Sequence, residues 1–240
     1  QVAEADVLLV RSVTQVNEVL LKHNRRINFV GSATIGLDHV DTDYLRRRQI
    51  PFANAPGCNA QSVVEHVISA LVILAERQNY RLSDRSVGVI GRGQIGSRLV
   101  TALSSLGVTV KANDPPKQSQ GEQGLAELEE VLACDIVSLH VPLVTDGAHA
   151  TYQLINAEHL KQFKPSKVLI NTSRGEVIDE RALQQQLDRA RGPLLVLDVY
   201  KGEPRIDPVT VNSCLFATPH IAGYSLEGRT KGTEMLYQAF

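Results

Sequence analysis

The amino-acid sequence predicts an α/β fold whose larger part is a doubly wound, mostly parallel sheet. Short apolar runs alternate with segments in which apolar residues recur every three or four positions, as strands alternate with helices in such folds. Three glycines, Gly91, Gly93 and Gly96, stand at one strand-to-helix junction with the spacing G-x-G-x-x-G. An acidic residue, Asp114, ends the apolar run that follows this helix. Together these observations predict a Rossmann-type sheet with a dinucleotide site.

The composition is that of an ordinary globular protein. Hydrophobic residues make up 43% of the 240 residues and charged residues 21%. The net charge of −1 gives no electrostatic reason to expect a nucleic-acid or membrane partner, and no apolar run has the length of a membrane span. The three cysteines, Cys58, Cys134 and Cys214, are odd in number and widely spaced, which argues against a disulfide framework and a zinc site. We therefore expect a cytoplasmic location.

The first block of the chain predicts a small α/β unit of its own. Strands are expected at residues 6–10, 27–30 and 50–53, with helices at 17–22 and 41–48 between them. Asp41 is the expected N-cap of the second helix. A break at residues 54–57 precedes a long apolar helix, residues 59–77, which we expect to be largely buried and to bridge two domains.

The second block alternates strands and helices through to residue 217. Strands are expected at 87–90, 108–112, 136–140, 168–171, 194–199 and 215–217, and helices at 94–106, 125–132, 157–163 and 180–190. Asn156 and Asp179 are the expected caps of the last two helices, and the polar residues 115–124 are expected to form a surface loop. The chain starts without an initiator methionine and ends within a helical pattern, so we expect it to be part of a longer protein.

Each residue of the glycine turn has a physical task in a dinucleotide site. Gly91 permits the tight turn, Gly93 lets the backbone approach a pyrophosphate, and Gly96 lets the helix pack closely on the strand. The helix N-terminus offers free N–H groups and a partial positive charge to the phosphates. Asp114 can accept hydrogen bonds from the ribose hydroxyls and would repel a 2′-phosphate, which favours NAD over NADP. The alternative is a glycine-rich turn without a ligand.

Three polar residues follow the last three strands of this block. Ligands of open parallel sheets bind beyond the carboxyl ends of the strands, and there the sequence places Arg174, Glu203 and His220. Arg174 offers a planar fork for a carboxylate, His220 can exchange a proton near neutral pH, and Glu203 can orient its ring. With a nicotinamide, these groups predict hydride transfer at a hydroxyl carbon next to a carboxylate. His140 also ends a strand, and we interpret it as structural.

Three motifs resemble those of one known family. Residues 171–175 (NTSRG), 203–204 (EP) and 218–222 (TPHIA) are similar to motifs of the D-isomer-specific 2-hydroxyacid dehydrogenases, in which the Arg, Glu and His are catalytic. Residues 10–14, 55–60, 114–116 and 221–228 resemble a member that acts on a phosphorylated sugar acid. The resemblance therefore implies an NAD-dependent oxidoreductase for a small phosphorylated 2-hydroxy acid, working as a homodimer. Two alternatives remain: a dehydrogenase of D-3-phosphoglycerate or another D-2-hydroxy acid, and an NAD-sensing protein without turnover.

The resemblance also implies a domain plan. Residues 1–56 would be the incomplete N-terminal part of a flavodoxin-like substrate domain, and residues 57–220 a Rossmann-type NAD domain that includes the long helix. Residues 221–240 would form a helix that returns to the substrate domain. An earlier strand and helix of the substrate domain and a C-terminal dimerisation region would lie outside this sequence.

Further contacts follow from matching positions in the family motifs. Gln94 and Ile95 would lie at the pyrophosphate; the other cofactor contacts implied are Val141, Thr172, Ser173, Asp198 and Gly223. The substrate contacts implied are Ser12, Thr34 and Tyr224. Val141 stands where the resemblance suggests a threonine, so only a backbone contact to NAD would survive there. Arg11, at the end of a strand, is our candidate for the substrate phosphate. The alternatives are that Arg11 forms an ion pair with a neighbouring acid, or that residues outside this sequence bind the phosphate. No spacing of His, Asp and Glu predicts a metal site.

Overall fold

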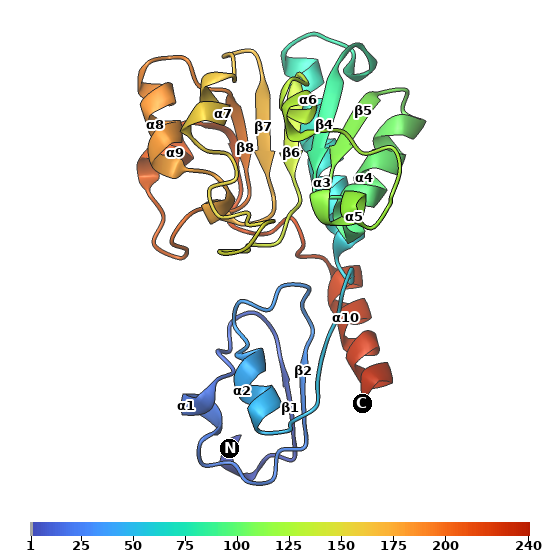
Figure 1. Ribbon diagram of the computed structural model, residues 1–240, viewed down its shortest axis with the longest axis vertical. Helices are drawn as coiled ribbons and strands as arrows, with labels where there is room; N and C mark the ends of the chain where they lie inside the picture. Colours follow the sequence, from blue (N-terminus) through green and yellow to red (C-terminus); the bar gives the residue numbers. More distant parts are fainter. Residues whose placement is uncertain (1) are drawn as a thin grey trace. The chain divides into compact units, whose positions relative to one another are not determined.

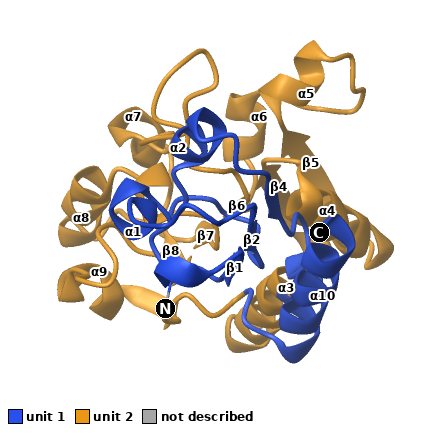
Figure 2. Cartoon of the chain, turned by 90° about the horizontal axis from the view of Figure 1, so that it is seen from below, with its two compact units in different colours: residues 1–62, 223–240 blue, residues 63–222 orange. Residues whose placement is uncertain are grey.

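The computed structural model describes residues 2–240, which fall into two compact units (Figures 1 and 2). Unit 1 runs up to Ser62 and also contains Gly223–Phe240, whereas unit 2 is Val63–Ala222. The division lies inside the long helix α3 (Ala60–Arg77), later in the chain than the boundary expected after residue 56. Most of α3 belongs to unit 2 because its apolar residues, among them Val67 and Leu71, pack in the core of that unit.

Unit 1 is built on three parallel strands in the order β1-β2-β3. The strands are β1 (Val7–Val10), β2 (Phe29–Ser32) and β3 (Phe52–Asn54), and the helical segments are η1 (Val2–Glu4), α1 (Glu18–Leu21), α2 (Thr42–Arg47) and α10 (Leu226–Ala239). The Asp41 side chain accepts a hydrogen bond of 2.8 Å from the backbone N–H of Tyr44, which confirms the expected cap of α2. The carboxyl ends of β1 and β2 are in register, with Val10 opposite Ser32.

The two faces of this small sheet are covered by different parts of the chain. One core contains Val30 of β2 together with Val16, which precedes α1, Leu21 of α1 and Leu45 of α2. On the sheet's second face, Gly31 is the close neighbour of Leu236 from α10. The final helix is thus part of unit 1, although more than 150 residues of unit 2 separate it from β3 in the sequence.

Unit 2 contains a parallel sheet of six strands in the order β5-β4-β6-β7-β8-β9 (Figure 1). The strands are β4 (Ser86–Ile90), β5 (Thr109–Asn113), β6 (Ile136–Leu139), β7 (Val168–Asn171), β8 (Leu194–Leu197) and β9 (Cys214–Ala217). The strand order changes direction at β4, which has β5 on one side and β6 on the other. In open sheets of this kind, the ligand crevice lies at the carboxyl ends of the strands at this point.

Helices cover both faces of the six-stranded sheet, which confirms the doubly wound prediction. Alternate strand residues point to opposite faces: Ile170 packs with α3 and α4, whereas its neighbour Leu169 packs with α6, α7 and α8. The helical segments are η2 (Leu82–Asp84), α4 (Gln94–Ser105), α5 (Pro115–Ser119), α6 (Leu128–Leu132), α7 (Ala157–Lys161), η3 (Gly175–Val177), α8 (Glu180–Asp188) and α9 (Pro208–Asn212). Asn156 and Asp179 cap α7 and α8 as expected.

Two expectations about elements of unit 2 are wrong. Residues 115–119 form the short helix α5 instead of a loop, because Asp114 caps it and prolines occupy its first turn. The long helix α3 is buried along one face only: Val72 is 53% exposed and Ile73 is 41% exposed. Within residues 2–240, no helix combines the length and the apolar character needed to cross a bilayer.

Candidate active site

The glycine turn connects β4 to α4 at the point where the strand order changes. Gly91 has a φ of +90°, and a Cβ there would lie 2.5 Å from the carbonyl oxygen of His140. At Gly96 a Cβ would lie 1.9 Å from the Gly91 carbonyl oxygen, so this glycine is required for close packing of the helix on the turn. Gly93 differs, because its φ is −74° and a Cβ would meet nothing within 4 Å. The protein itself therefore does not require glycine at position 93, whereas a closely approaching pyrophosphate would.

The N-terminus of α4 is open to a ligand. The helix begins at Gln94 and Ile95, and its N-cap residue Gly93 provides no side-chain hydrogen bond to the first N–H groups. Unsatisfied N–H groups at a helix N-terminus bind anions such as phosphate. Asp114 lies at the carboxyl end of β5, and its Oδ2 accepts a hydrogen bond of 2.7 Å from the N–H of Arg92 in the turn. The residues of this turn therefore fit a dinucleotide.

The next two strand ends place polar groups beside the glycine turn. His140 is buried, and burial lowers its pKa to about 4, so the ring is neutral near pH 7. Its Nε2 bonds the Ser138 hydroxyl at 2.8 Å and its Nδ1 lies 3.3 Å from the Thr172 hydroxyl. Val141, which follows, is in reach of the turn, since a Cβ on Gly91 would lie 2.9 Å from its Cγ1. His140 thus joins β6 to the end of β7, and its neutral ring fits a structural role.

The turn after β7 presents Arg174. Asn171 fixes this turn, because its Nδ2 donates to the Arg174 carbonyl at 2.8 Å and its Oδ1 accepts from the N–H of Ser173 at 3.0 Å. Thr172 and Ser173 are buried within it. Gly175 permits the close approach of the next loop, since a Cβ there would lie 2.0 Å from the backbone carbon of Tyr200. This requirement for glycine depends on a contact between distant parts of the chain, so no local motif indicates it.

Glu203 and His220 form a hydrogen-bonded pair. Glu203 Oε2 accepts from His220 Nδ1 at 2.7 Å, while Glu203 Oε1 accepts from the N–H of Tyr200 at 2.8 Å. The bond from Glu203 raises the pKa of His220 above its usual value, against the opposing effect of burial. Burial alone would raise the pKa of Glu203, but the hydrogen bonds from His220 and Tyr200 outweigh it and lower that pKa. Arg174 is close enough for its charge to lower the pKa of both groups.

The backbone at His220 is held by Asp198. His220 has a φ of +55°, a left-handed conformation that costs energy for a residue other than glycine. The buried Asp198 carboxylate accepts hydrogen bonds of 2.8 Å from the N–H groups of Ile221 and Ala222, and one of 2.6 Å from the Thr218 hydroxyl. Asp198, which the family motifs imply as a cofactor contact, therefore also shapes the segment that carries the histidine.

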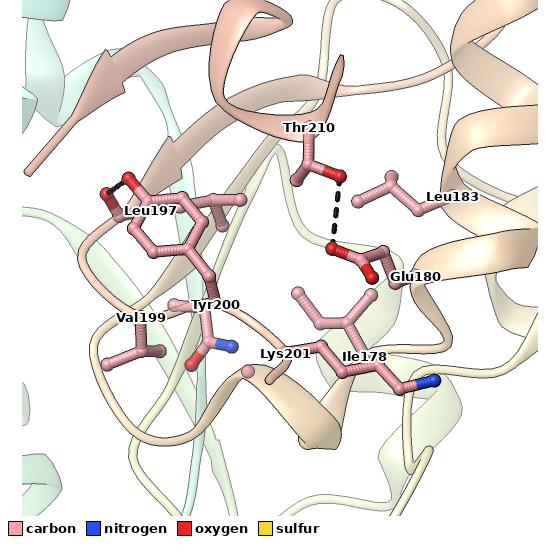
Figure 3. Close-up of a pocket in the computed structure, with 10 residues that line it drawn as sticks. Ile178, Glu180, Leu183, Leu197, Val199, Tyr200, Lys201 and Thr210 are labelled. Carbon is pink, nitrogen blue, oxygen red and sulfur yellow. Dashed lines mark hydrogen bonds between the residues drawn. The ribbon is translucent and has the colours of Figure 1, made fainter. Parts of the chain in front are cut away.

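A small pocket lies beneath these loops and does not include the reactive side chains (Figure 3). Its walls include Gly175, Tyr200 and Lys201, which belong to the loops that carry Arg174 and Glu203. Tyr200 donates its hydroxyl hydrogen to the Leu197 carbonyl at 3.0 Å, and burial raises its pKa to about 12. Arg174, Glu203 and His220 do not line this pocket, so we assign it no part in the site.

The remaining site residues belong to unit 1. The Arg11 guanidinium donates to the carbonyl of Arg229 at 3.0 Å and to the Thr233 hydroxyl at 3.1 Å. Among the ion pairs found within residues 2–240, none involves Arg11. Ser12 is exposed at the end of β1, and Tyr224 is 70% exposed with its hydroxyl bonded to Arg229 at 3.0 Å.

The other two unit 1 residues, Thr34 and Gly223, have different surroundings. Thr34 bonds the Ser32 hydroxyl at 2.7 Å, and Ser32 in turn bonds His39 Nε2 at 2.9 Å. His39 is buried and belongs to no recognised motif, so it was not among the predicted site residues. Gly223 lies against Asn59 of the same unit, where a Cβ would be 2.2 Å from the amide nitrogen.

Neither a metal cluster nor a disulfide is found among residues 2–240. No group of three His, Cys, Asp or Glu side chains is arranged to bind a metal ion in this part of the chain. Cys58, Cys134 and Cys214 are free thiols.

The chain is similar to curated proteins over nearly its whole length. Erythronate-4-phosphate dehydrogenase of Hahella chejuensis is 57% identical over 235 residues, which are 98% of this chain and 61% of that protein. The enzyme of the same name from Colwellia psychrerythraea is 51% identical over 249 residues, covering 100% of this chain and 63% of that protein. The chain thus spans less than two thirds of the length of these relatives.

A solved structure and a family profile complete the comparison. The crystal structure of D-lactate dehydrogenase from Aquifex aeolicus, complexed with NAD and lactic acid, superposes with a TM-score of 0.81. It is 25% identical, and the match covers 99% of this chain and 82% of that one. The profile of the D-isomer specific 2-hydroxyacid dehydrogenase NAD binding domain matches residues 65–222, nearly the whole of unit 2. The chain belongs to the D-isomer-specific 2-hydroxyacid dehydrogenase family, and its unit 2 is the NAD-binding domain of that family.

Proposed function

We propose that this protein catalyses the NAD-dependent oxidation of 4-phospho-D-erythronate to (R)-3-hydroxy-2-oxo-4-phosphooxybutanoate. The observation that carries the proposal is the Glu203–His220 pair, joined at 2.7 Å beside the charge of Arg174 at the carboxyl ends of an NAD-type sheet. The names of the relatives from Hahella chejuensis and Colwellia psychrerythraea support this substrate. The reaction would be a step of pyridoxal phosphate synthesis, carried out by a cytoplasmic homodimer.

The hydrogen bond between Glu203 and His220 determines which nitrogen can accept a proton. A carboxylate can only accept, so the Nδ1 of His220 carries the hydrogen and its Nε2 has a free lone pair when the ring is neutral. Nε2 is therefore the atom that takes the proton of the substrate's C2 hydroxyl. Glu203 stabilises the imidazolium ion that results, as its effect on the pKa of His220 indicates.

Arg174 binds the C1 carboxylate of the substrate through its planar fork and fixes C2 beside the histidine. When bound, NAD⁺ supplies the acceptor for the hydride that leaves C2. The C2–H bond breaks with its electron pair as the C2–O double bond forms, and the proton of the C2 hydroxyl passes to His220. Gly91, Gly93, Gly96 and the first N–H groups of α4, at Gln94 and Ile95, would hold the pyrophosphate.

The other predicted residues complete the proposal. Asp114 would bind the ribose hydroxyls; Val141, Thr172, Ser173, Asp198 and Gly223 are proposed contacts nearer the nicotinamide. Ser12, Thr34 and Tyr224 would contact the substrate. Arg11 would bind its phosphate, because the partners found for its guanidinium among residues 2–240 are carbonyl and hydroxyl oxygens, which do not neutralise its positive charge.

A panel of substrates tests the proposal. The full-length protein is incubated with NAD⁺ and 4-phospho-D-erythronate, D-3-phosphoglycerate or unphosphorylated D-erythronate, and reduced nicotinamide is measured by absorbance. We expect kcat/KM to be highest for 4-phospho-D-erythronate. A preference for D-3-phosphoglycerate would replace the proposed substrate and keep the chemistry, whereas NAD binding without turnover of any acid would indicate a binding protein.

A further inference from the structure

Four charged groups surround the predicted ribose end of the dinucleotide site. Asp114 accepts hydrogen bonds through both carboxylate oxygens, from the backbone N–H of Arg92 at 2.7 Å and from that of Lys117 at 3.2 Å. The backbones of these two basic residues are therefore fixed beside Asp114. Arg92 comes from the glycine turn, whereas Lys117 comes from α5. Arg92 also has a buried Nε without a hydrogen-bond partner in the part of the chain that the structure describes.

The fourth group, Glu122, binds both basic side chains. Its Oε1 lies 3.2 Å from Arg92 Nη1 and its Oε2 lies 3.1 Å from Lys117 Nζ, so that each oxygen has one cation. The three side chains are about two thirds shielded from solvent, with exposed fractions of 27% to 36%. Glu122 is also fixed through its backbone, because its N–H donates to the Lys117 carbonyl at 3.1 Å. The Arg92 and Lys117 side chains are therefore both paired with the Glu122 carboxylate.

The charges of this cluster bear on the choice between NAD and NADP. NADP differs from NAD by a 2′-phosphate on the ribose that Asp114 is expected to bind, and Arg and Lys are the side chains that bind phosphate. Asp114 and Glu122 contribute −2, and Arg92 and Lys117 contribute +2, so the cluster is neutral. Without Glu122 the same groups would carry +1, and both cations would be released beside the ribose.

We propose that Glu122 is a specificity-determining residue that disfavours NADP by occupying Arg92 and Lys117. Asp114 would repel the 2′-phosphate directly, whereas Glu122 would deny it the two cations that could bind it. The proposal rests on the glycine turn being the nucleotide site, and binding of NAD by the unaltered protein tests that premise separately.

The test is the affinity of the full-length protein for NAD and NADP, measured by isothermal titration calorimetry at low ionic strength. In Glu122→Gln, which keeps the shape of the side chain, we expect NADP to bind at least about tenfold more tightly and NAD to change less than about threefold. The double variant Arg92→Gln/Glu122→Gln should lose most of this gain, because one released cation is then absent. Glu122→Ser removes the same charge, so the same affinities are measured on this variant if Glu122→Gln does not fold.

Glu158→Gln is the matched control, because it removes one carboxylate of unit 2 that forms an ion pair with Lys161 on the surface of α7. We expect it to change neither affinity. An unchanged affinity of Glu122→Gln or Glu122→Ser for NADP would overturn the proposal. Equal tightening of both cofactors, or the same gain in Glu158→Gln, would also overturn it, because either result would be a general effect of charge.

Discussion

His220 is the residue on which the proposed chemistry depends, and the structure gives it two constraints. Its ring is oriented by Glu203. Its backbone has a left-handed conformation, and the residues that follow it, Ile221 and Ala222, are fixed by hydrogen bonds to Asp198. The ring and the backbone are thus fixed by different parts of the chain. This arrangement leaves Nε2 as the only ring nitrogen able to accept a proton.

The pH profile of oxidation should report this pair. A general base must be neutral, and the pKa of His220 is raised, so kcat/KM should rise with pH and level off above a pKa higher than 6.5. Glu203→Gln removes the charge that raises this pKa. We therefore expect its profile to shift to lower pH, with a lower plateau because the imidazolium ion is less stabilised. An unshifted profile would mean that Glu203 does not act through His220.

Replacement of His220 separates catalysis from binding. His220→Ala should lower kcat by about 10²- to 10⁴-fold, the usual contribution of a general base. The dissociation constant of NAD should stay within about threefold of the unaltered protein, because the glycine turn is untouched. The exposed His149 gives a control variant, His149→Ala, which should retain both properties. Loss of NAD binding in His220→Ala would assign the histidine a structural role.

At the scale of elements, the sequence predicted what local patterns determine. Apolar periodicity located the strands of unit 2, and the capping residues Asp41, Asn156 and Asp179 were identified correctly. The short helices α5 and α9 were missed, because each contains only one turn and lacks an apolar period, although Asp114 and Asp207 cap them. Two features could not be predicted, because both depend on contacts between separate segments. They are the close approach of the Tyr200 backbone to Gly175 and the hydrogen bond between His39 and Ser32.

Two glycines of the site should respond differently to the same substitution. Gly175→Ala places a Cβ against the backbone of Tyr200, so it should destabilise the protein by about 1–3 kcal/mol and displace the Glu203 loop. Gly93→Ala meets nothing within 4 Å, so it should lose no more than the ~1 kcal/mol typical of alanine at an N-cap, while its affinity for NAD falls. Denaturant unfolding and NAD titration of both variants check this contrast. Unchanged NAD binding by Gly93→Ala would mean that no pyrophosphate approaches that residue.

For the whole molecule, the proposed tasks divide between the two units. The glycine turn, Arg174, Glu203 and His220 all lie in unit 2, to which the NAD-binding family profile corresponds. The proposed substrate contacts Arg11, Ser12, Thr34 and Tyr224 lie in unit 1, which that profile does not cover. The sequence therefore predicted the cofactor more directly than the substrate, because a Rossmann turn is a local motif and the substrate contacts came only from resemblance.

This division predicts that a change at Arg11 affects the substrate and not the cofactor. Arg11→Gln removes a charge that would bind the phosphate, and charged hydrogen bonds contribute about 1.5–3 kcal/mol, so KM for 4-phospho-D-erythronate should rise about 10- to 150-fold. The dissociation constant of NAD and the activity on unphosphorylated D-erythronate should stay within about threefold, since neither involves the phosphate. Arg46→Gln, which breaks an exposed ion pair with Asp43 in the same unit, is the matched control. An equal loss on both acids would assign Arg11 to the carboxylate end or to the fold of unit 1, where its bonds to Arg229 and Thr233 join β1 to α10.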